Sequence, residues 1–216
     1  MKTPAILISS LVFGLGLSAA TMAEEAGWYG RAHGGLSSLA DADGNFAFEG
    51  EQQQAKVDTD TGGFAGIAGG YRFGSGWRTE LAWEYRRNEF AGSIGSINYP
   101  TADFASSTLY LNGIYAFGSG SHWTPYVGAG VAWAQEVDID FERDGVEQSY
   151  SSSGDTGFQV FAGVDYSVSP RWILSGELRY SNISTLDLEP ESGAPGLITD
   201  MDYQHTSLQL GLSYQF

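Results

Sequence analysis

Apolar and polar side chains alternate strictly along the last ten residues of the chain. Leu208, Leu210, Leu212, Tyr214 and Phe216 occupy the even positions, and small or polar residues stand between them. Because successive side chains of a strand point to opposite faces, this pattern predicts a β-strand with one apolar face and one polar face. We expect lipid on the apolar side of this strand and water on the other.

Seven further segments show the same period of two, and each is about as long as the 9 to 11 residues that a tilted transmembrane strand needs. The segment 77–86 is the clearest, because large apolar residues alternate there with two arginines and two glutamates. The eight predicted strands are 27–36, 64–73, 77–86, 109–117, 127–133, 158–166, 172–180 and 207–216.

The connections between these segments are short and long in alternation. The short ones, at 74–76, 118–123 and 169–171, are rich in Gly, Ser and Pro, as tight turns are. The long polar ones, at 37–63, 87–106, 137–156 and 182–204, are predicted to be loops. This alternation is typical of bacterial outer-membrane barrels, whose short turns are periplasmic and whose long loops are extracellular. The sequence therefore predicts an all-β fold, an eight-stranded antiparallel up-and-down transmembrane β-barrel with both termini in the periplasm.

The first residues have the features of a secretory signal peptide. Lys2 precedes an apolar run over residues 5–17, and small residues follow up to Ala23. The run is shorter than the roughly 20 residues that a membrane-spanning helix needs. We predict a signal peptide over residues 1–23, cleaved after Ala23 or, as second choice, after Ala20. Residues 24–216 then form one outer-membrane β-barrel domain, since only helices and closed barrels satisfy every backbone group in lipid.

A soluble β-sandwich or a lipocalin-like barrel also has alternating strands, so the pattern of one strand does not distinguish the two classes. The positions of the aromatic residues favour a membrane barrel over a soluble fold, because these residues gather at the two ends of the predicted strands, as in interfacial girdles. The group beside the short turns is Tyr71, Phe73, Trp77, Phe117, Tyr166, Trp172, Tyr214 and Phe216, and the group toward the long loops is Trp83, Tyr85, Trp133, Phe158 and Tyr180.

From the alternation along the predicted strands, five basic and five acidic side chains are expected to point into the lumen. They are Arg31, Arg72, Arg78, Glu80, Glu84, Arg86, Glu136, Asp165, Glu177 and Arg179. An eight-stranded barrel is just wide enough for side chains to fill it, and buried charges must pair to offset their desolvation. We therefore predict an Arg–Glu network that plugs most of the bore. The alternative is a narrow porin-like channel for small solutes, because small inward residues such as Gly66, Ala82 and Gly128 leave room for water.

The composition also argues against several classes of function. The chain has 26 acidic and 10 basic residues and a formal net charge of −16, which disfavours nucleic-acid binding. It has no cysteine, so it forms neither disulfides nor thiolate metal sites. The segment 41–45 begins like a calcium-binding loop, but Phe46 and Gln52 stand where the turn glycine and the bidentate glutamate belong. We expect the acidic loops to attract divalent cations or surface partners only loosely.

The predicted orientation of the side chains on the strands also disfavours catalysis. Lipid A deacylases carry a His-x-Ser pair, and His205 and Ser207 have that spacing, but both point into the predicted lumen. The segment Arg179–Asn182 also resembles the motif. Arg179 stands there in the place of the general base, and arginine does not act as a general base at neutral pH. His33, His122 and His205 are scattered, which argues against a histidine metal site. We expect no catalytic residue and no cofactor, and a lipid A hydrolase is the least favoured alternative.

The opening Gly27–Gly30, the girdled hairpins and the ending Leu212–Phe216 resemble those of small bacterial outer-membrane barrels. This is the OmpA/OmpX-like family described as the outer membrane protein beta-barrel domain. The resemblance implies that Leu212, Tyr214 and Phe216 form the signal read by the barrel-assembly machinery. It also implies an outer-membrane location among lipid and lipopolysaccharide. We expect a non-enzymatic protein with a structural or surface-interaction role through its acidic extracellular loops.

Overall fold

The computed structural model describes residues 26–40, 42–48, 51–59, 61–94, 97–118, 121–143, 146–191 and 194–216. The predicted signal peptide and its cleavage site lie outside the described residues. Within them, no helix is long and apolar enough to cross a membrane. The strands are β1 (Gly27–Leu39), β2 (Ala42–Phe48), β3 (Glu51–Thr59), β4 (Thr61–Arg72), β5 (Trp77–Ile94), β6 (Ile97–Ala116), β7 (Trp123–Arg143), β8 (Val146–Ser152), β9 (Thr156–Ser167), β10 (Trp172–Pro190) and β11 (Leu197–Gln215).

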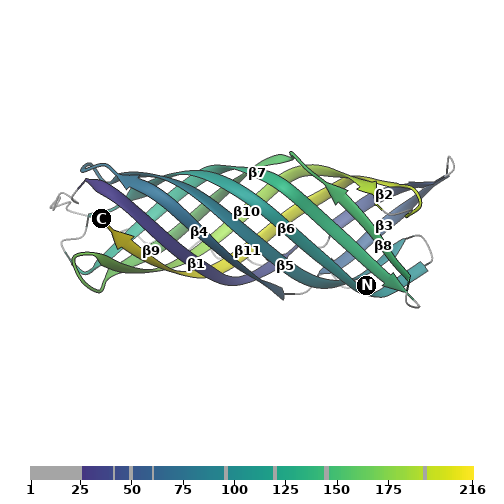
Figure 1. Ribbon diagram of the computed structural model, residues 1–216, viewed down its shortest axis with the longest axis horizontal. Helices are drawn as coiled ribbons and strands as arrows, with labels where there is room; N and C mark the ends of the chain where they lie inside the picture. The colour runs from purple at the N-terminus through teal and green to yellow at the C-terminus, as the bar shows by residue number, and fades with distance from the viewer. Residues whose placement is uncertain are drawn as a thin grey trace, which may run out of the picture.

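These strands follow eight antiparallel lines that close into a barrel, because three pairs of strands are continuous (Figure 1). β1 continues into β2, and β3 continues into β4. The two continuous strands pair with each other in a single register, in which Ser38 pairs with Thr61 and Ala42 with Val57. β8 continues into β9 along β7 in the same way. Pairing of β11 with β1 closes the ring. The predicted eight-stranded antiparallel barrel is confirmed.

Most of the described residues in the four stretches predicted as long loops lie instead in strands, and that prediction is wrong. β5 and β6 remain paired as far as Ile94 and Ile97, and β10 and β11 as far as Leu188 and Ile198. β7 has 21 residues, which at about 3.3 Å per residue and a tilt of about 40° rise about 50 Å. The hydrocarbon core of a bilayer is about 30 Å thick, so the sheet continues about 20 Å beyond it. We call the girdled part the membrane segment and the continuation the projecting segment.

The outer wall of the membrane segment is apolar, as the sequence predicts. Leu208 and Leu210 on β11 are 63% and 66% exposed. Aromatic rings contact one another at the turn end, where Trp28 lies 5.1 Å from Tyr71 between ring centroids. This is the exterior of a protein whose solvent on that side is lipid.

Bulges change which residues face inward where the projecting segment begins. In β7, Glu136 pairs with Ser107 and Ala134 pairs with Thr108, so Gln135 is an extra residue. A bulge of this kind moves the following side chains to the opposite face. In β11, Asp200 adopts a φ of 58°, a left-handed conformation that aspartate tolerates better than most residues.

The projecting segment therefore has an apolar interior, the reverse of the membrane segment. Val137, Ile139 and Phe141 of β7 point inward and are at most 1% exposed, and Asp138 and Asp140 between them point outward. The other large inward side chains of this core are Leu39, Phe46, Phe104, Tyr150, Leu186, Leu188, Ile198, Met201 and Tyr203. In water, an apolar interior stabilises the extended barrel as it stabilises a soluble protein.

Candidate functional site: the charged lumen

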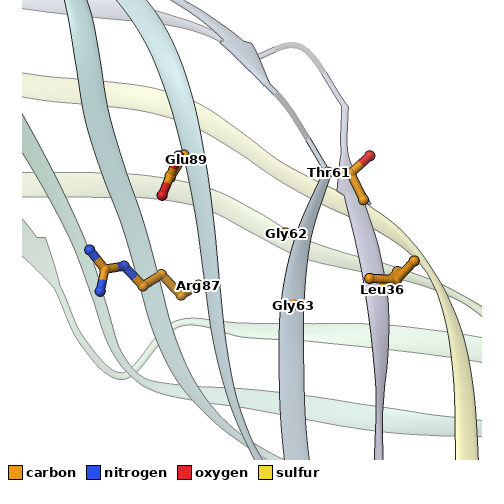
Figure 2. A pocket seen from close by; sticks show the side chains of 6 residues that line it. All are labelled: Leu36, Thr61, Gly62, Gly63, Arg87 and Glu89. Atoms are coloured by element: carbon orange, nitrogen blue, oxygen red, sulfur yellow. The ribbon is translucent and has the colours of Figure 1, made fainter.

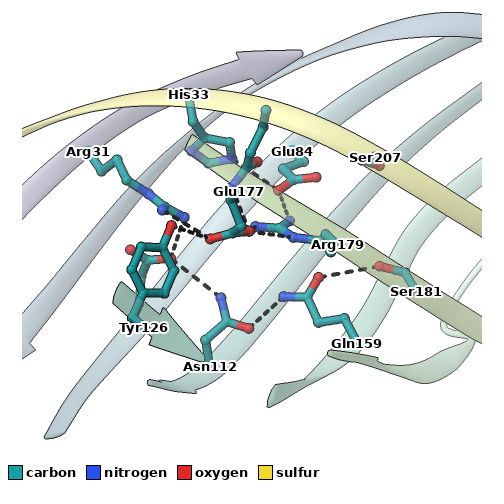
Figure 3. A network of polar contacts seen from close by, with 12 residues as sticks. Arg31, His33, Glu84, Asn112, Tyr126, Gln159, Glu177, Arg179, Ser181 and Ser207 are labelled. Atoms are coloured by element: carbon teal, nitrogen blue, oxygen red, sulfur yellow. Dashed lines mark hydrogen bonds and ion pairs between the residues drawn. The ribbon is translucent and has the colours of Figure 1, made fainter. Parts of the chain in front are cut away.

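Arg179 lies at the centre of the lumen and connects its opposite walls (Figure 3). Its strand, β10, stands four positions from β5 around the eight-membered ring. The guanidinium forms an ion pair with Glu84 of β5 across the bore, and its Nη2 lies 2.8 Å from Glu177 Oε1. The Arg179 side chain is completely buried. The contact with Glu84 spans the lumen at mid-height.

Ion pairs continue from Arg179 on both sides. Glu177 Oε2 lies 3.7 Å from Arg31 Nη1, and Arg31 Nη2 lies 2.8 Å from Glu80 Oε1. On the other side Arg86 Nη2 lies 3.3 Å from Glu84 Oε2. Three arginines thus alternate with three glutamates in one buried chain, which we call the charge network. Such pairing offsets the desolvation of each charge.

Neutral side chains saturate the carboxylates of the charge network. Tyr126 donates to Glu177 at 2.9 Å, Gln209 donates to Glu177 at 2.7 Å, and Tyr29 donates to Glu80 at 3.1 Å. Asn112 of β6 contacts Glu80 and accepts a hydrogen bond from Gln159 of β9. Sequence reasoning did not assign these residues to the site. Their inward positions in the period-two pattern are the signal that identifies them.

A second group of charged side chains lies inside the lumen near the short turns. Arg78 Nη1 lies 2.6 Å from Asp165 Oδ2, and its guanidinium carbon lies 6.0 Å from the centroid of the Tyr126 ring. Arg72 donates to Gln215 at 2.9 Å and stacks 5.1 Å from the Tyr29 ring. These inward arginines are at most 5% exposed.

Of the ten predicted lumen residues, the structure places all but Glu136 inside the barrel. Glu136 is exposed on the outer wall, so its assignment to the lumen is wrong. The cause is the bulge at Gln135, which interrupts the simple alternation on which the assignment rested.

The His-x-Ser pair lies inside the barrel, where the sequence places it. His205 and Ser207 are each 1% exposed, with 3.3 Å between His205 Nδ1 and Ser207 Oγ. Arg86 donates to Ser207, and the histidine that contacts Glu84 is His33. The described residues thus give His205 no carboxylate partner. They also contain no group of three His, Asp or Glu side chains placed to hold a metal ion.

The other predicted motifs lie on strands. The described part of the calcium-like segment, residues 42–45, lies in β2. Leu212 and Phe216 point outward and are 46% and 79% exposed, and the Tyr214 hydroxyl accepts a hydrogen bond from Arg171 at 3.1 Å. Their role in barrel assembly remains a prediction.

A closed barrel with an apolar girdled exterior and paired charges inside defines the class of transmembrane β-barrels. The family model described as "Outer membrane protein beta-barrel domain" matches residues 8–216. The chain belongs to this family, and it is an outer-membrane protein.

Solved structures show the same fold. The outer membrane protein OprG from Pseudomonas aeruginosa is 19% identical, with a TM-score of 0.65, over 89% of this chain and 98% of that one. Neisserial surface protein A is 22% identical, with a TM-score of 0.51, over 89% of this chain and 100% of that one. At these identities the likeness concerns the fold alone. No curated protein sequence matched the chain.

Proposed function

We propose that this outer-membrane protein is a non-conducting, non-enzymatic barrel that holds a stiff acidic projection outside the cell. In this orientation the short turns lie in the periplasm and the projecting segment rises above the outer leaflet. Two observations support the proposal: buried, mutually paired charges lie inside the membrane segment, and a cluster of buried apolar side chains lies inside the projecting segment.

The buried side chains inside the two segments differ in chemistry, and each group opposes the passage of ions. In the membrane segment, Arg179 and Glu84 join opposite walls, and neither side chain is more than 2% exposed. In the projecting segment, Ile139 and Leu188 belong to a packed core and have no exposed surface. A hydrated ion that passed through would have to break buried ion pairs and then cross a dry apolar region, and each step is strongly unfavourable.

The outer wall of the projection is the surface offered for contacts. Asp103 of β6 stands directly opposite Asp140 of β7, and Asp138 lies beside them. Partial burial together with the nearby Glu136, Glu191 and Asp140 raises the pKa of Asp138 to about 6. A partner that brings positive charge relieves this repulsion, so cationic surfaces and divalent cations are the contacts this wall favours.

Planar-bilayer recording tests the proposal. We expect the full-length barrel to give no reproducible conductance steps, and Glu136→Gln on the outer wall to behave in the same way. Reproducible steps whose size changes in Glu84→Gln but not in Glu136→Gln would contradict it and favour a narrow pore.

The absence of enzymatic activity is tested separately. Expression of the protein in the outer membrane of a Gram-negative host is expected to leave the mass profile of lipid A unchanged. Loss of one acyl chain, abolished by Ser207→Ala, would instead assign hydrolysis to the His-x-Ser pair.

A further inference from the structure

The hairpin of β2 and β3 joins the sheet through an interruption on each of its two sides. On the β5 side, the regular pairing of β4 with β5 stops at Gly63 and Arg87, and β3 resumes it at Thr59 and Phe90. An open depression of about 540 Å³, lined in part by Gly62, marks this interruption on the outer wall (Figure 2). Beyond it, five residue pairs hold β3 to β5.

The attachment to β11, on the other side of the hairpin, is weaker. β1 pairs with β11 as far as Leu39 and His205. The same register returns at Asn45 and Thr199, and the described residues 42–44 of β2 form no ladder pair with β11 in between. The renewed pairing comprises three residue pairs. The β11 side is therefore the edge at which the hairpin separates most easily from the barrel.

His205 lies inside the barrel at the base of this edge. Its side chain is 1% exposed, and its ring centroid lies 5.3 Å from that of Tyr203 on the same strand. Tyr203 belongs to the apolar core of the projecting segment together with Leu39 of β1 and Phe46 of β2. A hairpin that is paired with β11 keeps the imidazole buried, and separation of the two would expose it to water.

The hydrogen bonds around His205 suit a neutral imidazole. Arg86 Nη1 donates to Ser207 Oγ at 3.1 Å, and the same oxygen lies 3.3 Å from His205 Nδ1. A hydroxyl that accepts from Arg86 can donate its own hydrogen to a neutral ring nitrogen, whereas a protonated Nδ1 would compete with Arg86 for that oxygen. His205 Nε2 has no hydrogen-bond partner among the described residues. A buried imidazolium would therefore be poorly compensated.

The charged groups that face His205 do not reverse this preference. They are Arg86 and Glu84 of β5 and Arg179 of β10. Glu84 already forms ion pairs with both arginines, and its Oε1 lies 3.0 Å from Nε2 of His33 on β1. The one carboxylate among these groups is thus fully engaged, and two guanidinium groups repel a further positive charge.

We propose that the β2–β3 hairpin is an acid-sensitive flap, which separates from β11 when His205 takes up a proton. In the open state water surrounds the imidazole, and a hydrated histidine takes up a proton near its ordinary pKa of about 6.5. Because the closed state disfavours this proton, each pH unit below about 6.5 shifts the equilibrium toward the open state by up to about tenfold. The charge network need not change, so the inference goes beyond the proposed function and does not depend on whether the lumen conducts.

Hydrogen–deuterium exchange of the full-length barrel in lipid nanodiscs, measured by mass spectrometry of its peptides, tests the flap. Exchange times at pH 7.5 and pH 5.0 are scaled to the intrinsic exchange rate at each pH. Protection of residues 42–59 should fall between about 3-fold and 30-fold at pH 5.0, since this pH is about 1.5 units below 6.5. His205→Gln is neutral at both pH values and should abolish the fall. The control His122→Gln, which removes an exposed histidine at the short turns, should preserve it.

A disulfide across the β11 edge tests which side opens. The chain has no cysteine, so Asn45→Cys combined with Thr199→Cys places one bond between directly opposed residues of β2 and β11. The oxidised double variant should show no acid-dependent fall, and the reduced form should behave as the wild type. This comparison tests the flap even if His205→Gln does not fold. Unchanged protection of residues 42–59 in the wild type, an equal fall throughout the projecting segment, or a fall that persists in His205→Gln or in the oxidised variant would overturn the proposal.

Discussion

Replacement of Arg179 by methionine probes the charge network at its centre. The substitution keeps an unbranched, flexible stem but removes the guanidinium between Glu84 and Glu177. Glu84 then keeps Arg86 at 3.3 Å, and Glu177 keeps Arg31 at 3.7 Å together with neutral donors. One net negative charge remains uncompensated in a buried lumen, and breaking a buried pair in this way costs about 3–5 kcal/mol. We expect the free energy of unfolding to fall by that amount.

The assay is equilibrium unfolding of the barrel in lipid vesicles by guanidinium chloride, followed by tryptophan fluorescence. Arg171→Met, at an exposed arginine, serves as the control and should change stability by less than about 0.5 kcal/mol. The double variant with Glu84→Gln restores neutrality and should recover at least half of the loss. A loss below about 1 kcal/mol for Arg179→Met, with no recovery in the double variant, would show that water solvates these charges and would refute the sealed lumen.

Three further predictions concern the projecting segment. Ile139→Ala should lower the free energy of unfolding by about 2–5 kcal/mol, because it opens a cavity in a packed core, whereas Val131→Ala on the lipid-facing wall should have a much smaller effect in the same assay. Glu136→Gln should leave stability within about 0.5 kcal/mol of the wild type, since its carboxylate is exposed; a loss as large as that of Glu84→Gln would place it back in the lumen. Asp138 has a folded-state pKa above its unfolded value, so its contribution favours folding below about pH 4 and is lost as pH rises through about 6. Asp138→Asn should therefore raise the melting temperature at pH 7.5, by an amount corresponding to about 1 kcal/mol after solvent screening, but not at pH 4, and an equal rise at both would contradict this reasoning.

The strand order and the facing of the membrane segment could be predicted because lipid imposes a strict pattern. Leu208 and Arg78 each follow from the rule that outward residues are apolar and inward charges must pair. The same rule explains why the sequence pattern alone predicts that the arginines and glutamates of β5 and β10 point inward.

The projecting segment was not predicted, because water lies on its outer side and reverses the pattern. Val137, Ile139 and Phe141 alternate with acidic residues, but the rich polar composition around them suggested a loop. A bulge depends on pairing with the neighbouring strand, so the extra residue Gln135 carries no local signal of its own. This is why Glu136 was assigned to the wrong face.

The central claim is that the lumen is sealed from bulk water. Solid-state NMR of the barrel in bilayers, with magnetisation transferred from bulk water to arginine side chains, measures this directly. The guanidinium of Arg179 should receive magnetisation several times more slowly than that of the exposed Arg171. Equal transfer rates for the two residues would mean that water reaches the charge network freely, and would contradict the account.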